Sequence, residues 1–199
     1  MNEISTLNLM TIFSLIRTGI VGCLISAFAY ALLFYSNAWL TSELVFSSGV
    51  NWIYLPAGLR LFLTLIFGLP GAIGIGVASF LISYAGALPH DLVLCIGTGV
   101  ISGFAPYLAR LIIFSNIKLE PDLSNLSLPN LLVCIFLYAL LCAGLHQAWY
   151  RLMGLEDSGS LNHFAVMFVG DVLGSLLLIS LIKASLDFLR RSGRLGRLS

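Results

Sequence analysis

Long apolar segments dominate this chain and restrict what it can fold into. Six of them carry almost no charge and lie at residues 16–35, 52–67, 72–87, 92–114, 131–150 and 164–186. A helix of about 20 apolar residues crosses the roughly 30 Å hydrocarbon core of a bilayer. In that core only helices and closed barrels satisfy every backbone polar group. The pattern therefore predicts an all-α, polytopic integral membrane bundle of about six transmembrane helices, with residues 1–199 forming a single domain.

The composition favours the same class of protein. Of the 199 residues, 59% are hydrophobic and only 10% are charged, whereas soluble domains carry about 25% charged residues. The net charge of +1 argues against nucleic acid as a partner, because phosphate binding needs a basic patch or stripe. We expect the lipid bilayer to be the main partner. The four cysteines form no Cys-x-x-Cys pair, and we interpret them as small buried side chains.

Basic residues indicate the orientation of the bundle. The last helix and the basic tail at residues 187–199 together contain Lys183, Arg190, Arg191, Arg194 and Arg197. Loops on the cytoplasmic side of a membrane carry an excess of Lys and Arg, so we place this tail in the cytoplasm. An even number of helices then puts the N-terminus on the same side. We expect a multi-pass protein of a bacterial inner membrane with both termini cytoplasmic.

The connections between helices contain turn formers and small residues. Residues 37–51 are too polar to span, so we expect an interfacial helix or a loop, with Trp39 and Trp52 at headgroup level. Residues 68–71 read Gly-Leu-Pro-Gly, which predicts a tight turn and a closely packed hairpin of the second and third helices. Pairs of small residues four positions apart favour close helix approach; they are Ala27/Ala31, Ala72/Gly76, Gly99/Gly103 and Gly170/Gly174.

Two charged residues, Arg60 and Asp171, fall inside apolar segments. An ionised side chain within a bilayer is costly, and it usually marks a functional site or a partner charge. Counted from the outer ends of their helices, both residues lie about 12 Å deep at 1.5 Å per residue. Equal depth allows three interpretations: a structural ion pair that locks two helices, a ligand-binding pair at the floor of a pocket, or part of a proton or ion pathway, for which more than one carboxylate would be expected.

Other polar residues lie near the same depth. Thr64 is one helical turn below Arg60, Ser175 is one turn below Asp171, and His146 and Gln147 lie near the outer end of the fifth helix. We take these four as candidate pocket residues. For His146 we favour a hydrogen-bonded packing role over that of a ligand or a titrating switch.

The motifs of membrane enzymes are missing from the sequence. It has no His-Glu-x-x-His and no pair of carboxylates at helical spacing inside the membrane. The three histidines lie far apart in sequence, whereas a metal site needs three or four converging ligands. Ser175 has no His or Lys at helical spacing to activate it. We therefore expect a protein that is not an enzyme and that uses no metal or other cofactor.

Two short motifs carry a family resemblance. The segment Trp52-Ile53-Tyr54-Leu55-Pro56-Ala57-Gly58-Leu59 is similar to a Trp-Pro-Pro-x-Gly-like helix start, and Asp171-Val172-Leu173-Gly174 matches an Asp-x-x-Gly in a late helix. In these motifs the chain resembles the membrane-associated sensory domain of bacterial histidine kinases and cyclic-di-GMP enzymes, or a related family of small bacterial membrane proteins. That family has about eight helices and a fused signalling domain. No kinase or cyclase follows the last helix here, so the resemblance implies a sensor that acts through a separate signalling protein.

A second resemblance concerns size and helix number. About six helices and Ala27-x-x-x-Ala31 in the first of them resemble the substrate-binding component of energy-coupling-factor transporters. This implies a small-solute uptake component with a separate energising protein. Our favoured expectation is a sensory or ligand-binding module with a small-molecule pocket in the outer half of the bundle. Uptake is the first alternative, and a membrane scaffold or assembly subunit is the second.

Overall fold

The computed structural model describes residues 2–47, 49–117, 127–155 and 158–195. In these ranges, five helical segments are long and apolar enough to cross a membrane, namely 15–40, 69–87, 92–115, 128–152 and 161–185. They belong to α1 (Asn2–Leu40), α3 (Leu69–Ile82) with the π-helical turn that continues it (Ser83–Ala87), α4 (Leu92–Ile117), α5 (Leu128–Leu152) and α6 (Leu161–Leu195). The chain is thus a multi-pass, all-α membrane bundle, as its apolar segments predict.

The second predicted span is shorter than expected. Helix α2 covers Leu55–Phe67, which is 13 residues and about 20 Å at 1.5 Å per residue. That is less than the roughly 30 Å hydrocarbon core. Pro56 lies in the first turn of α2, where its fixed φ suits a helix start. The chain before Leu55 is extended, so α2 begins three residues later than predicted and reaches only part of the way across.

Residues 37–51 contain a small β-hairpin, where the sequence predicts an interfacial helix or a loop. Helix α1 continues to Leu40, and a 3-10 turn at Ser42–Leu44 leads into β1 (Val45–Ser47) and β2 (Val50–Asn51), which pair antiparallel. Gly49 takes a positive φ of 75° in the turn, a conformation that glycine adopts without steric cost. The hairpin satisfies backbone groups that a plain loop would leave to solvent.

The extended segment after β2 lies directly against α6. The Tyr54 amide donates to the Gly170 carbonyl at 3.1 Å. A Cβ placed at Gly170 would lie 2.1 Å from the Asn51 carbonyl oxygen, and one at Gly174 would lie 2.0 Å from that of Tyr54. The Gly170/Gly174 pair therefore accommodates mainly extended backbone, and the predicted close helix approach occurs next to it, where a Cβ at Gly58 of α2 would lie 2.7 Å from Ser175 Cα. Non-helical backbone is tolerated at membrane depth when it is buried in protein.

The other predicted small-residue contact joins two helices as expected. A Cβ at Gly103 would lie 2.2 Å from the Ala72 carbonyl oxygen, and one at Gly99 would lie 2.7 Å from that of Gly76. These glycines let the backbones of α3 and α4 touch, and this is the most extensive helix contact in the bundle.

The hairpin of α2 and α3 is less closely packed than predicted. A turn at Gly68, whose φ is 60°, joins the two helices. However, α2 packs mainly against α6, while α3 packs mainly against α4 and α1. The side chains of α2 enter both major apolar clusters, one shared with α4, α5 and α6 and the other with α1 and α3. The short helix therefore occupies the centre of the bundle, which explains why most of its residues are buried.

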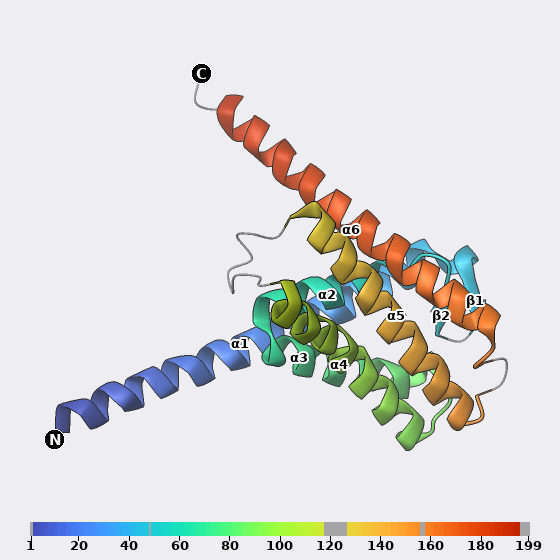
Figure 1. Cartoon of the computed structure of the whole chain (residues 1–199), viewed down its shortest axis with the longest axis horizontal. Helices are drawn as coiled ribbons and strands as arrows, with labels where there is room; N and C mark the ends of the chain where they lie inside the picture. Colours follow the sequence, from blue (N-terminus) through green and yellow to red (C-terminus); the bar gives the residue numbers. More distant parts are fainter. Residues whose placement is uncertain (1, 48, 118–126, 156–157, 196–199) are drawn as a thin grey trace.

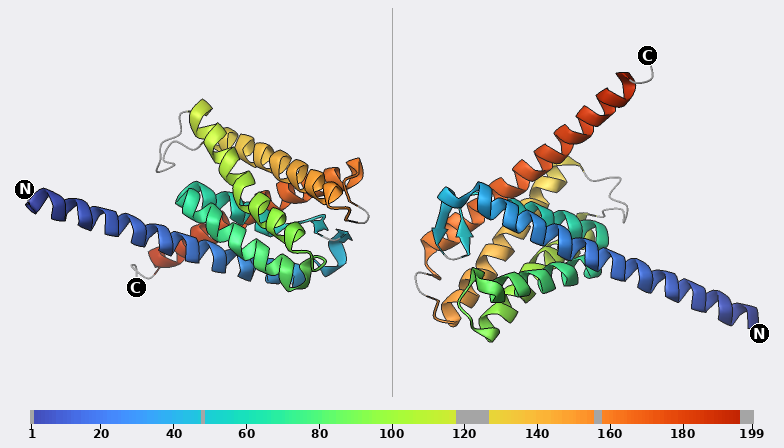
Figure 2. Two further views of the ribbon diagram at one scale, coloured as in Figure 1. Left: turned by 90° about the horizontal axis from the view of Figure 1, so that it is seen from below. Right: turned by 180° about the vertical axis from the view of Figure 1, so that it is seen from behind.

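Both chain ends project from the same side of the bundle. Helix α1 extends toward the N-terminus and α6 toward the C-terminus, away from the β-hairpin at the opposite end (Figure 1). The views from below and behind show the same separation (Figure 2). Helix α6 continues to Leu195, so the start of the predicted tail at 187–199 is helical, while residues 196–199 lie outside the described ranges.

The contact of α6 with the extended segment can be tested by enlarging one glycine. We expect Gly174→Ala to lower the free energy of unfolding by at least about 1–3 kcal/mol, the usual cost of overpacking, because its methyl group would meet backbone. Gly144→Ala is the matched control, since its Cβ would find only Phe164 Cε2 at 3.9 Å. Thermal unfolding in mild detergent measures both, and equal midpoints for the two variants would contradict the contact.

Candidate functional site

Arg60 lies at the centre of the site, 4% exposed, on α2. Its Nη2 donates hydrogen bonds to the hydroxyls of Tyr30 and of Tyr54, the latter at 3.1 Å. Its Nη1 faces Cys142 Sγ at 3.7 Å, and its Nε has no hydrogen-bond partner among the described residues. Residues from α1, the extended segment and α5 therefore converge on one guanidinium group.

The two tyrosine rings also stabilise the cation through their faces. The Arg60 Cζ lies 4.9 Å from the Tyr30 ring centroid and 5.2 Å from that of Tyr54. Both distances are within the range of about 6 Å for cation–π attraction, which is strongest when the groups are desolvated. The two hydroxyls lie 3.0 Å apart and bond to each other, so they orient one another around Arg60.

The segment that carries Tyr54 is positioned by a residue of α1. The Asn37 side-chain oxygen accepts from the Leu55 amide at 3.0 Å, and its nitrogen donates to Thr41 Oγ1 at 3.0 Å. Tyr54, at the N-cap position, makes no side-chain capping bond, so Asn37 supplies the cap from a neighbouring helix. Asn37 is 1% exposed, which shows that the polar segment 37–51 begins inside the fold.

Asp171 lies on α6, 1% exposed, but it does not form the direct ion pair considered in the sequence analysis. No nitrogen of Arg60 lies within 4.0 Å of an Asp171 oxygen, and in the part of the chain that the structure describes Asp171 Oδ2 has no hydrogen-bond partner. Because both side chains are buried, their charges attract each other beyond hydrogen-bond distance. The tyrosine hydroxyls satisfy the guanidinium where the carboxylate was expected to do so.

His146 lies in a chain of hydrogen bonds between α5, α4 and α3. Its Nδ1 is 2.9 Å from the Cys142 carbonyl oxygen, and its Nε2 is 3.3 Å from Ser102 Oγ. Ser79 Oγ donates to Ser102 Oγ at 2.8 Å. All three side chains are at most 3% exposed. This geometry agrees with the hydrogen-bonded packing role favoured from the sequence, and it also connects His146 to Ser79.

The remaining predicted residues are buried but lie in separate environments. The Thr64 hydroxyl donates to the Arg60 carbonyl within α2, and Ser175 Oγ has no hydrogen-bond partner. The Gln147 side-chain oxygen accepts from the Gly159 amide at 2.9 Å, so it anchors the connection before α6. None of these three side chains lines the cavity described next.

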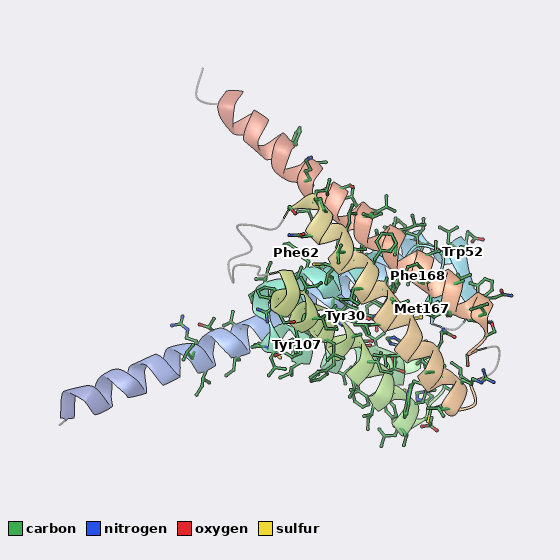
Figure 3. All side chains as sticks on the ribbon, in the orientation of Figure 1. Tyr30, Trp52, Phe62, Tyr107, Met167 and Phe168 are labelled. Atoms are coloured by element: carbon green, nitrogen blue, oxygen red, sulfur yellow. The ribbon has the colours of Figure 1, made fainter. Side chains whose placement is uncertain are left out.

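A cavity of about 250 Å³ is lined by Arg60 and its neighbouring side chains and also by residues of the β-hairpin. Its walls include Arg60, the two tyrosines Tyr30 and Tyr54 that contact it, and His146 and Ser79 from the neighbouring hydrogen-bond chain. Tyr30 and Met167, both labelled in Figure 3, contribute to its walls from α1 and α6. Asp171 does not line it. Of the two charges found in the sequence, Arg60 alone faces this space.

Sequence reasoning missed Tyr30, Tyr54, Cys142 and Ser79. Tyr54 lies six residues before Arg60, beside a helix-starting proline, but its role depends on an extended backbone that periodicity does not reveal. Tyr30, Cys142 and Ser79 lie in apolar segments where each looks like an ordinary packing residue. Their shared signal is a hydroxyl or thiol group on a buried face, and only the fold brings these groups together.

Comparisons with known proteins provide no further assignment. No protein-family model, no curated protein and no solved structure matches this chain. Within the described ranges, no three His, Cys, Asp or Glu side chains are grouped so that they could hold a metal ion. The resemblances noted in the sequence therefore stay predictions, and the site is interpreted from its own geometry.

Tyr30 and Tyr54 surround the Arg60 guanidinium, and we call them the tyrosine cage. Their contribution can be tested by deleting one hydroxyl. We expect Tyr30→Phe to lower the free energy of unfolding by about 1.5–3 kcal/mol, the usual contribution of a hydrogen bond to a charged group. Tyr35→Phe, on the same helix and 58% exposed, should change it by less than about 0.5 kcal/mol. Denaturant titration in mixed micelles compares the two. A neutral Tyr30→Phe would show that the cage does not stabilise the buried cation.

The electrostatic link between Arg60 and Asp171 can be measured with a double-mutant cycle. We expect Asp171→Asn to destabilise the protein when Arg60 is present and to have a smaller effect in an Arg60→Met background. The difference should be about 0.5–3 kcal/mol, as for coupled neighbours. Unfolding free energies of the four proteins give the coupling, and strictly additive effects would show that the two charges are independent.

Proposed function

We propose that this protein is a ligand-binding sensory module of a bacterial inner membrane, with both termini cytoplasmic and the cavity open toward the outer face. The observation that carries the proposal is a buried cation without an acidic contact, placed at the wall of a cavity. An ionisable group within a membrane domain is costly and is typical of a site for an ion or a ligand. A purely structural arginine would gain more from a contacting carboxylate, and Asp171 is near but not in contact.

The orientation rests on two observations. The basic residues of the C-terminal tail favour the cytoplasm, and α1 and α6 leave the bundle on the side away from the hairpin (Figure 1). In this orientation the hairpin forms the outer rim of the cavity. Val45, Ser47 and Gly49 from the hairpin line the cavity, so it is within reach of the external solution.

The residues that contact Arg60 connect the ligand site with helices that reach the partner protein. A ligand at Arg60 competes with or strengthens the contacts to Tyr30 on α1 and Cys142 on α5. Only a ligand with different affinities for two helix arrangements shifts the balance between them. Helix α1 runs from the cage to the cytoplasmic side in this orientation, where a separate signalling protein would detect its displacement.

Small-solute uptake is the alternative, and one contact weakens it. The Ala27/Ala31 pair, expected to dock an energising protein, packs against the cluster of α1 and α3 that includes Ile75 and Ala78. These alanines already have neighbours within the chain. A scaffold role would require no cavity at all, so the cavity beside Arg60 favours a ligand-binding function.

Purification in mild detergent, followed by mass spectrometry of all proteins and small molecules, tests this function. We expect a kinase, cyclase or other signalling protein and a small molecule to co-purify, and Arg60→Ala to lose the small molecule selectively. Arg151→Ala, an exposed cation on α5, is the matched control and should retain it. An ATPase or transmembrane energising subunit would instead support uptake. Protein without a partner or a small molecule would contradict both functions.

A further inference from the structure

The hydrogen-bond chain beside the cavity has a fixed direction. The Cys142 carbonyl oxygen only accepts and lies 2.9 Å from His146 Nδ1, closer than the Cys142 thiol at 3.5 Å, so we place the proton of the ring on Nδ1. In a neutral ring Nε2 then accepts, and Ser102 is the group that donates to it. Ser102 in turn accepts from Ser79, whose hydroxyl proton is used in this bond at 2.8 Å. Ser79 is left with acceptor lone pairs, and it lines the cavity.

Arg60 lines the same cavity, and it offers hydrogen-bond donors where Ser79 offers acceptors. Its guanidinium donates only, and in the described structure its Nε has no partner and no carboxylate contacts it. Both Arg60 and Ser79 are more than nine-tenths buried. The cavity is thus lined by a cation at Arg60 and by an acceptor at Ser79. Apolar side chains line the same cavity, among them Ile82, Leu88 and Met167.

We propose that the cavity binds a small hydroxycarboxylate, with its carboxylate on Arg60 and its hydroxyl donating to Ser79. This inference rests on the proposed ligand-binding function and specifies the ligand class. A hydroxyl donor suits Ser79 better than an ammonium group, because a second cation would repel Arg60. Among the described residues that line the cavity, Arg60 is the one cation and no carboxylate is present, so a monoanion balances the charge and is favoured over a dianion such as phosphate.

The cavity volume limits the size of the acid. At about 250 Å³, the cavity lies just below the roughly 300–1,000 Å³ of pockets for drug-sized ligands. A carbon skeleton of a few atoms, with a short apolar part against Ile82 and Leu88, fits this space. The acids chosen for the test below differ in the distance between their hydroxyl and carboxylate groups.

The test measures binding of matched compounds to the purified full chain by calorimetry. Lactate, 3-hydroxybutyrate and 4-hydroxybenzoate carry both groups, while propionate, butyrate and benzoate lack the hydroxyl, and 3-hydroxybutyramide lacks the charge. We expect at least one hydroxy acid to bind about tenfold tighter than its partner without the hydroxyl, and the amide not to bind. Equal affinity within every pair, or no binding by any hydroxy acid, would overturn the proposal.

Substitution of Ser79 tests whether its hydroxyl oxygen accepts the hydrogen bond from the ligand hydroxyl. Ser79→Ala should remove the preference for the hydroxy acid. The affinity of this variant for the matched acid without the hydroxyl should stay within about twofold of the wild-type affinity. Ser180→Ala, on the exposed face of α6, should retain the preference. A preference that survives Ser79→Ala would overturn the assignment of the acceptor, and the wild-type panel decides the ligand class even if the variant does not fold.

The two proposals fail in different ways. If a neutral or cationic small molecule co-purifies in an Arg60-dependent manner and no hydroxy acid binds, the ligand class is wrong and the ligand-binding function stands. If nothing co-purifies and no compound of the panel binds, both are wrong.

Discussion

The structure depends on the stabilisation of one buried cation. Arg60 lies among apolar helices, where an ionised group without partners is strongly unfavourable. Two tyrosine hydroxyls and two aromatic faces stabilise it, and Tyr30 and Tyr54 come from segments far apart in sequence. The site therefore exists only when α1, α2 and the extended segment are assembled. This requirement links the stability of the bundle to the integrity of the cavity.

The extended segment before α2 makes that assembly geometrically feasible. If residues 51–54 were helical, Tyr54 would follow the helical spacing to Arg60 and would face a different direction. Instead, their backbone lies against Gly170 and Gly174 of α6, and the Asn37 side chain caps the helix that follows. The short α2 then starts inside the bundle. Irregular backbone at this depth lines a cavity, a setting in which membrane proteins tolerate it.

The sequence predicted the membrane class and the long helices, because apolar length is a strong local signal, and it singled out Arg60, which the structure buries beside a cavity. It did not predict the tyrosine cage, since Tyr30 and Tyr54 come together only through tertiary contacts. The Gly170/Gly174 pair has the same sequence pattern as Gly99/Gly103, yet one contacts extended backbone and the other a helix. Local spacing identifies close approach, but it does not identify the neighbouring element. The expected direct pairing of Arg60 with Asp171 likewise rested on their spacing along two helices, and the two side chains are not in contact.

We infer that Arg60 faces a water-accessible cavity on the outer side of the membrane. The most direct test of this inference is labelling of Ser83→Cys by a membrane-impermeant thiol reagent in intact cells, with Cys23, Cys95, Cys134 and Cys142 replaced by serine. Ser83 lines the cavity, and Ser180→Cys on the exposed face of α6 is the lipid-facing control. The account predicts labelling of Ser83→Cys from outside and none of Ser180→Cys. Labelling of Ser83→Cys only after the membrane is permeabilised, or not at all in folded protein, would contradict it.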